Sequence, residues 1–161
     1  MRQCVILMAM SLLTAACYDG AEYLTMAPNA TLVLDVALDE DPDDVEAIVD
    51  AAEAWSVATG GFVDLKLRFG RFRRDDDANN IAAGPRGEGG VTLTSDEREP
   101  DILLDVDLDR HTLTLLAMHE LGHAFGVPHD RAPDHLMSAT FARDLPLVVD
   151  EFALNEFWKR H

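Results

Sequence analysis

Cysteine and basic residues are scarce in this 161-residue chain. Both cysteines, Cys4 and Cys17, lie near the N-terminus, so we expect no disulfide within the folded part. Lysine and arginine together number 13, against 30 aspartates and glutamates, which gives a formal net charge of −17. Such a chain has no basic stripe to displace counterions from a phosphate backbone, and nucleic acid is therefore excluded as a partner.

Long apolar runs are lacking as well. The run Val5–Leu13 covers about nine residues, well short of the roughly 20 that span a bilayer as a helix. Because Arg2 precedes it and small residues follow it, the run is typical of a signal peptide. Any contact with a membrane should therefore come from a processed N-terminus and not from a membrane-spanning helix.

The leader ends at Cys17, and Thr14-Ala15-Ala16-Cys17 resembles the lipobox of bacterial lipoproteins. Thr14 stands where that pattern usually has leucine. A lipid anchor on Cys17 is one expectation, and ordinary secretory cleavage near Ala15-Ala16 is the alternative. Either route predicts an exported protein, which is a cell-envelope lipoprotein in the first case and a secreted protein in the second.

The remaining chain divides into a tether and one domain. Residues 18–30 contain Gly, Pro and Asn without an apolar period, and they are typical of a short linker. Residues 31–161 are long enough to bury a core, and we expect them to fold as one domain and to remain monomeric.

Hydrophobic periodicity predicts a strand, a helix and a second strand at the start of the domain. Apolar residues alternate from Leu32 to Leu38 and again from Val63 to Phe69. Between them, Asp41-Pro42-Asp43-Asp44 is a helix start, and apolar residues at helical spacing continue for about 16 residues before Gly60-Gly61. A crossover helix between two strands favours parallel pairing.

No period is visible from Arg71 to Glu88, which we predict to be a long surface loop. Its Asp75-Asp76-Asp77 run is able to ligate calcium, but a solvated acidic turn is favoured because the spaced ligands of a calcium loop are absent. Gly90–Ser95 and Asp101–Asp107 predict two further strands, of which the second is more apolar and should be more central.

Two further helices are expected, from Thr112 to Gly126 and from Asp150 to Lys159. The order of the elements suggests a mixed sheet covered by two helices, with the third helix packed below.

The segment His119–His129, with the sequence HELGHAFGVPH, carries the strongest chemical signal. Residues four apart share one face of a helix, so His119 and His123 are able to present imidazoles to the same ion. Gly126 allows a sharp turn with positive φ, and this turn would return His129 as a third ligand. Three neutral nitrogens and one open position are typical of a catalytic zinc site.

Glu120 lies one residue beyond the first histidine. Its carboxylate would be near the metal but offset from it, where it is able to take a proton from a metal-bound water. A protein that only stores zinc has no use for a carboxylate in this position.

The long motif resembles that of the metzincin zinc peptidases, and the details are most similar to the matrixin branch. Met137, eight residues beyond His129, matches the methionine turn that metzincins carry beneath the zinc. Ala54-Trp55-Ser56 and Thr59-Gly60-Gly61-Phe62 resemble bacterial matrixin-like domains. The resemblance extends from Leu32 to Trp158, and its most specific part is Leu116–Met137.

The resemblance implies an α+β zincin-like fold, which has a twisted, mostly parallel mixed sheet, an upper helix layer, an active-site helix and a C-terminal helix. It also implies a zinc-dependent endopeptidase that acts on protein or peptide substrates. One zinc would be held by His119, His123 and His129, with Glu120 as general base. Substrate would bind extended along an exposed strand, for which Gly90–Ser95 is the candidate.

Several residues depart from the matrixin pattern. Asp130 replaces the usual serine after the third histidine, and Ser138-Ala139 replaces the Tyr-Pro that follows the methionine. No histidine precedes His111, so we expect no second, structural zinc, and we likewise expect no cysteine-switch propeptide. The alternative function is a non-catalytic zinc-binding or adhesive lipoprotein on the same fold. The histidines outside the motif are expected at the surface or at helix ends: His111, His135 and His161.

Overall fold

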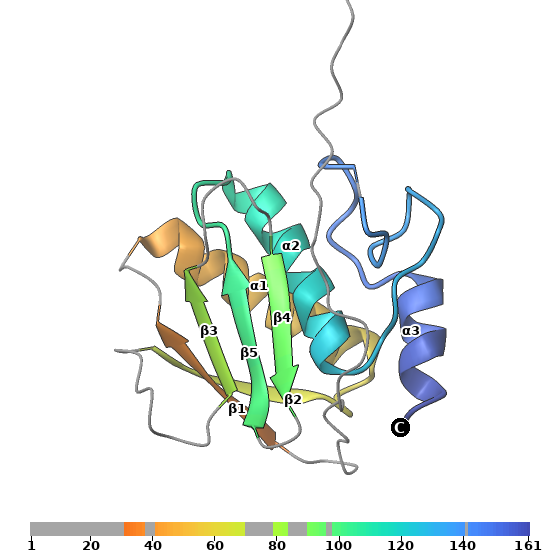
Figure 1. Cartoon of the computed structure of the whole chain (residues 1–161), viewed down its shortest axis with the longest axis horizontal. Coiled ribbons are helices and arrows are strands. Elements are labelled where there is room, and N and C mark those ends of the chain that lie inside the picture. The colour runs from red at the N-terminus through yellow and green to blue at the C-terminus, as the bar shows by residue number, and fades with distance from the viewer. Residues whose placement is uncertain (1–30, 38–40, 70–78, 84–89, 96–97, 141) are drawn as a thin grey trace, which may run out of the picture.

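The computed structural model describes residues 31–37, 41–69, 79–83, 90–95, 98–140 and 142–161. These residues form a five-stranded sheet in the order β2-β1-β3-β5-β4, together with three helices (Figure 1). All strand pairs are parallel except β4 with β5, so the predicted mixed, mostly parallel sheet is confirmed. The predicted leader, the tether, Cys17 and the Asp75–Asp77 run lie outside the described residues.

Strand β1 (Thr31–Ala37) and strand β2 (Asp64–Phe69) flank helix α1 (Pro42–Ala58) in sequence and pair in parallel, as predicted. The helix begins at its expected cap, where the Asp41 carboxylate accepts the N–H of Asp43 at 3.0 Å. Leu34 of β1 is buried, whereas its neighbour Asp35 points to the opposite face and forms an ion pair with Arg68. The period of two therefore separates a core face from a polar face.

Strand β3 (Asn79–Ala83) contradicts the prediction of an unbroken surface loop over residues 71–88. It is the central strand, paired in parallel with β1 on one side and β5 on the other. The only large apolar residue in NNIAA is Ile81, which is buried. The ladders along both edges stabilise this strand, and its own pattern of two asparagines and two alanines is typical of a turn.

Strand β5 (Arg98–Leu104) lies between β3 and strand β4 (Gly90–Ser95), so the more apolar of the two predicted strands is the inner one, as expected. It begins and ends three residues earlier than predicted. A register shift between Leu93 and Ser95 interrupts the β4–β5 ladder. Among the described strands, β4 is at one end of the sheet and has a partner on one side only.

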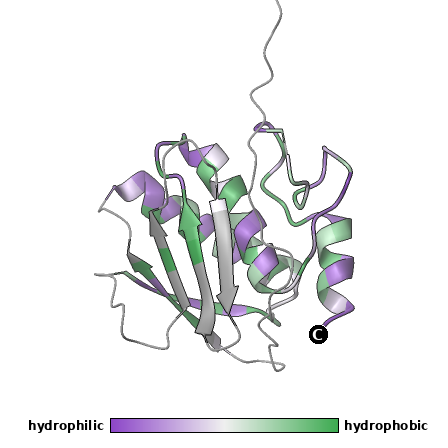
Figure 2. Cartoon of the chain, viewed as in Figure 1, coloured by the Kyte–Doolittle hydropathy of each residue, from purple (hydrophilic) through white to green (hydrophobic). Residues whose placement is uncertain are grey.

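Helix α2 (Arg110–Ala124) lies beside α1 on the same face of the sheet (Figure 1). Its N-terminus is capped by Asp109, whose carboxylate accepts the N–H of Thr112 at 3.1 Å. Most of α2 is buried, yet Figure 2 shows hydrophilic residues along it. Buried polar groups are costly unless they have partners. The hydroxyls of Thr112 and Thr114 bond locally to Asp109 and to the Arg110 carbonyl. The other buried polar residues of α2 are His119 and Glu120.

Helix α3 (Glu151–Trp158) stands to the side of the sheet (Figure 1). It packs through Phe157 against residues of the other two helices. The ring centroid of Phe157 lies 5.9 Å from that of Trp55 in α1 and 5.9 Å from that of Phe125, which ends α2. The indole N–H of Trp55 donates to the Met118 carbonyl at 2.9 Å. These buried aromatic contacts hold the C-terminal half of α2 in place.

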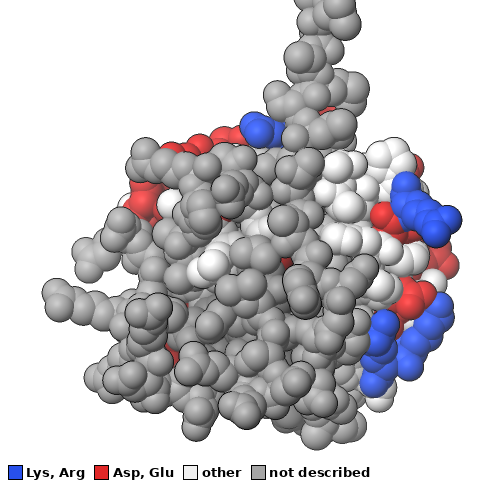
Figure 3. Space-filling view, viewed as in Figure 1, with Lys and Arg blue, Asp and Glu red and all other residues white. Residues whose placement is uncertain are grey.

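Charged side chains of both signs lie at the right-hand margin of the view in Figure 3, whereas acidic side chains line the upper left. In the part of the chain that the structure describes, no helix is both long enough and apolar enough to cross a bilayer.

Candidate metal centre

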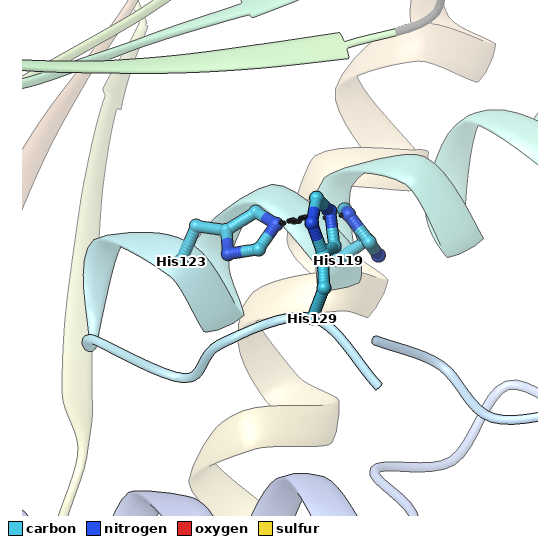
Figure 4. Close-up of side chains that lie close together, drawn as sticks. All are labelled: His119, His123 and His129. Atoms are coloured by element: carbon cyan, nitrogen blue, oxygen red, sulfur yellow. Dashed lines mark hydrogen bonds between the residues drawn. The ribbon is translucent and has the colours of Figure 1, made fainter. Parts of the chain in front are cut away.

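Three histidines bring their imidazole rings together at the C-terminal end of α2 (Figure 4). His119 and His123 lie one helical turn apart on α2, and His129 comes from the segment after the helix. The Nε2 atom of His123 is 3.0 Å from that of His119 and 3.2 Å from that of His129. His119 is buried, whereas the other two are partly exposed, so the cluster faces solvent on their side.

Backbone carbonyls orient two of the rings. Nδ1 of His119 donates to the Leu136 carbonyl at 2.7 Å, and Nδ1 of His123 donates to the Val127 carbonyl at 2.9 Å. Because a carbonyl only accepts, each Nδ1 must carry the proton, and each Nε2 keeps its lone pair for a metal. This is the tautomer that a metal ligand requires.

Burial and then the charge of His123 lower the pKa of His119 well below its ordinary value of 6.5. The hydrogen bond to the Leu136 carbonyl acts in the opposite direction but is the smaller effect. His119 is therefore neutral at physiological pH, which a metal ligand must be.

The turn after α2 returns the third histidine. Gly126 has a φ of 82°, as its predicted place in the turn requires. The Val127 N–H donates to the Gly122 carbonyl and the Gly126 N–H to the His123 carbonyl, each at 2.8 Å. This pair of bonds is a Schellman motif, which ends the helix and sends the chain back toward His129.

Met137 packs against α2 between the first two histidines. It is fully buried, and a Cβ added to Gly122 would lie 2.6 Å from its sulfur. Its carbonyl accepts the N–H of Asp130 at 2.8 Å. The missing side chain at Gly122 thus makes room for Met137, the residue that the resemblance to metzincins assigned to the methionine turn.

Asp150 connects α3 to this centre. One carboxylate oxygen caps α3 by accepting the Ala153 N–H at 2.8 Å, and the other accepts the Leu136 N–H at 2.6 Å. The carbonyl of Leu136 holds His119, so one residue links the cap to a histidine of the cluster. The sequence indicated Asp150 only as the start of a helix.

Glu120 follows His119 in α2 and is fully buried. The start of β4 lies against its carboxylate, because a Cβ added to Gly90 would be 2.7 Å from Oε1. The sequence carried no signal for this contact, because it joins residues 30 positions apart.

The donor set fits zinc. With a Zn–N distance of about 2.0–2.1 Å, two ligands of a tetrahedral ion lie about 3.3 Å apart, close to the observed Nε2 separations. Three lone pairs that meet at such distances repel one another unless a cation lies between them. Among the described residues, one cluster of His, Cys, Asp or Glu side chains has its ligand atoms close enough to hold a metal ion, and its members are His119, His123 and His129.

The remaining histidines bond elsewhere. His111 contacts the Leu145 carbonyl, His161 contacts the Phe125 carbonyl, and His135 forms an ion pair with Asp130. All three lie at the surface or at helix ends, as expected, although His135 also ties the turn after His129 to Asp130.

Comparisons with known proteins agree with this geometry. The sequence model of the matrixin family matches residues 26–154. Metalloproteinase-II from Bacteroides fragilis has a TM-score of 0.67 at 14% identity, over 94% of this chain and 57% of that chain. Archaemetzincin from Methanopyrus kandleri has a TM-score of 0.54 at 12% identity, over 81% of this chain and 95% of that chain.

No curated protein sequence matches this one. At such low identity the two solved structures show the fold, which is the predicted α+β zincin-like fold, and this chain spans 57% of the length of the Bacteroides protein. The family match covers most of the sequence and includes all three histidines. The chain therefore belongs to the matrixin family of zinc metallopeptidases.

Proposed function

We propose that this matrixin is an endopeptidase in which His119, His123 and His129 hold one zinc ion and Glu120 is the general base. The observation that carries the proposal is the convergence of three imidazole Nε2 atoms, with a buried carboxylate next to the first in the same helix. Its substrates would be proteins or peptides.

A zinc ion held by His119, His123 and His129 would lower the pKa of a water toward about 7 and would polarise the scissile carbonyl. Glu120 then takes a proton from the attacking water and delivers it to the leaving amine. Burial shields this carboxylate from bulk solvent, so that its proton passes to the substrate. Because water is the nucleophile, no covalent bond forms between substrate and protein.

The substrate backbone would pair with β4. This strand is at the end of the sheet, and its first residue lies against Glu120. An extended peptide that adds to β4 would therefore run past the general base.

The experiment that tests this proposal compares Glu120→Ala with His119→Ala. Glu120→Ala should keep zinc and fold but lose about 10²–10⁴-fold in peptide cleavage, because it lacks only the base. His119→Ala should lose zinc and activity together. Zinc content, thermal midpoint and cleavage of a mixed peptide library are measured side by side with the wild type.

Equal cleavage by Glu120→Ala with its zinc in place would show that the assigned base is wrong. Zinc binding by a wild type that cleaves no peptide in a broad library would favour the alternative, a non-catalytic zinc-binding or adhesive lipoprotein.

We further propose that the protein is exported and anchored through a lipid on Cys17. The supporting observation is the apolar Val5–Leu13 run that ends in small residues before this cysteine. Cys17→Ser should release the protein from membranes or block its processing, as membrane fractionation would show. An unmodified native N-terminus at another residue, found by mass spectrometry, would instead indicate ordinary secretion.

A further inference from the structure

Gly90, the first residue of β4, lies against the side chain of Glu120. A Cβ added there would be 2.7 Å from Oε1 and 2.8 Å from Cγ of Glu120, and 2.9 Å from Cδ1 of Leu116. Real Cβ atoms essentially never approach other atoms this closely. A side chain at position 90 and the present position of the Glu120 carboxylate therefore exclude each other.

The requirement for glycine here is spatial. The described glycines with positive φ are Gly60, Gly61 and Gly126, so the backbone at Gly90 is one that other residues adopt. Gly90 is buried and pairs with Leu104 of β5, which fixes its place in the sheet. Only the volume occupied by α2 side chains excludes a methyl group at this position.

We infer that Gly90 is a positioning residue for the reaction and that it sets where the Glu120 carboxylate lies relative to the three histidines. Leu116 lies one turn before Glu120 on the same face of α2 and is fully buried, so it blocks movement of the carboxylate in that direction. The backbone of β4 forms the facing side. The role assigned to Gly90 rests on the proposed function of Glu120, whereas the contact itself does not.

A methyl group at position 90 would fit if either the Glu120 carboxylate or strand β4 moved, and the two movements would change different kinetic constants. Displacement of the carboxylate would lower kcat and leave KM and zinc content unchanged, because β4 stays in place. Separation of β4 from α2 would instead disturb the strand proposed to pair with substrate and would raise KM.

The test is Gly90→Ala in the full chain, assayed for zinc content, kcat and KM. We expect kcat to fall at least about 10-fold, part of the 10²–10⁴-fold that general-base catalysis contributes, with KM and zinc unchanged. Gly122→Ala is the matched control, because it adds the same methyl to α2 against Met137 and should lower the thermal midpoint and zinc affinity. Unchanged kcat in Gly90→Ala would overturn the inference.

A stability cycle tests the contact without any assay of activity. Glu120→Ala removes two of the three nearest atoms that the new methyl would meet and leaves only Leu116 Cδ1, so Gly90→Ala should lower the thermal midpoint of Glu120→Ala much less than that of the wild type. If Gly90→Ala does not fold, recovery of folding in the double variant supports the inference. Equal losses in both backgrounds, or a double variant that is also unfolded, would overturn it. A wild type that cleaves nothing would refute the proposed function and leave this cycle to decide the contact.

Discussion

Asp130, directly after the third histidine, forms an ion pair with His135. The hydrogen bond to Asp130 raises the pKa of His135 above its ordinary 6.5, and the carboxylates of Asp150 and Asp134 act in the same direction. The hydrogen bond from His135 lowers the pKa of Asp130 below its ordinary 3.8. The His135 ring also stacks on Phe152 of α3, with 6.0 Å between ring centroids. Asp130, which departs from the matrixin pattern, thus has a partner that carries the opposite charge when His135 is protonated.

His135→Gln should lower the thermal midpoint slightly at about pH 6 and hardly at about pH 9. A histidine with a raised folded pKa contributes stability that is fully present below 6.5 and is lost as pH rises through the folded pKa. The effect should be small because both side chains are partly exposed. Asp130→Asn should show the same pH dependence, and an equal loss at both pH values would contradict the assignment.

Single residues differ in how far the sequence could predict them. The convergence of the three histidines was predictable because helical spacing and one glycine turn are local rules. The contacts of the Leu136 carbonyl with His119 and of Gly90 with Glu120 were not predictable, because only tertiary packing brings these residues together. Asp150 was predictable as a helix cap, but the bond from its second oxygen to Leu136 depends on how α3 docks.

Helices α1 and α3 have the same kind of N-terminal cap but different relations to the metal centre. Asp41 accepts only a local N–H, that of Asp43, in the hydrogen bonds described for it. Asp150 caps α3 and also holds the Leu136 N–H. A comparison of the two caps therefore separates the loss of stability caused by a missing cap from any change in zinc binding caused by the lost bond to Leu136.

Asp150→Ala and Asp41→Ala should each lower the free energy of unfolding by about 0.5–2 kcal/mol, the usual effect of a lost cap. Only Asp150→Ala should also weaken zinc binding, by several-fold, because outer partners of metal-binding histidines tune affinity. Urea unfolding and a competitive zinc titration of both variants test this. Equal zinc affinities in the two variants would show that the Asp150–Leu136 bond does not affect the centre.

Among the described elements, the helices and the strands other than β3 were predictable, whereas the central strand β3 was not. The alternation in β1 and the cap of α1 are visible in the sequence because each element has one face on the core. β3 is surrounded by other strands and is short, so Ile81 alone supplies its apolar signal. Its strand structure depends on β1 and β5, which are distant in sequence.

In the whole molecule, the sheet with α1 and α2 forms one body, and α3 packs beside it (Figure 1). The metal centre lies where α2 ends and the chain turns toward α3. Metal binding should therefore stabilise the docking of the C-terminal segment onto the sheet and its helices.

Removal of zinc with a chelator should lower the thermal midpoint, and metal-free protein should lose further stability as pH falls below 6.5. The folded pKa of His119 is lowered by burial, so below 6.5 the unfolded chain binds a proton that the folded chain does not. Thermal unfolding with zinc and with chelator, at about pH 7.5 and about pH 5.5, provides the measurement. In metal-free His119→Ala, the thermal midpoint should fall less between about pH 7.5 and about pH 5.5 than in the metal-free wild type. A wild-type midpoint unaffected by chelator would contradict the prediction.

All three histidines lie within the eleven residues from His119 to His129, a span that remains short even when the protein is unfolded. A denatured chain therefore keeps its imidazoles at a high effective concentration relative to one another and retains some affinity for zinc. Only the difference between native and denatured affinity stabilises the fold, so the native dissociation constant overstates the stabilisation by zinc. That difference comes from groups outside the short span, such as the Leu136 carbonyl and Met137. The rest of the fold, more than the three histidines themselves, thus determines how much zinc binding stabilises the folded protein against unfolding.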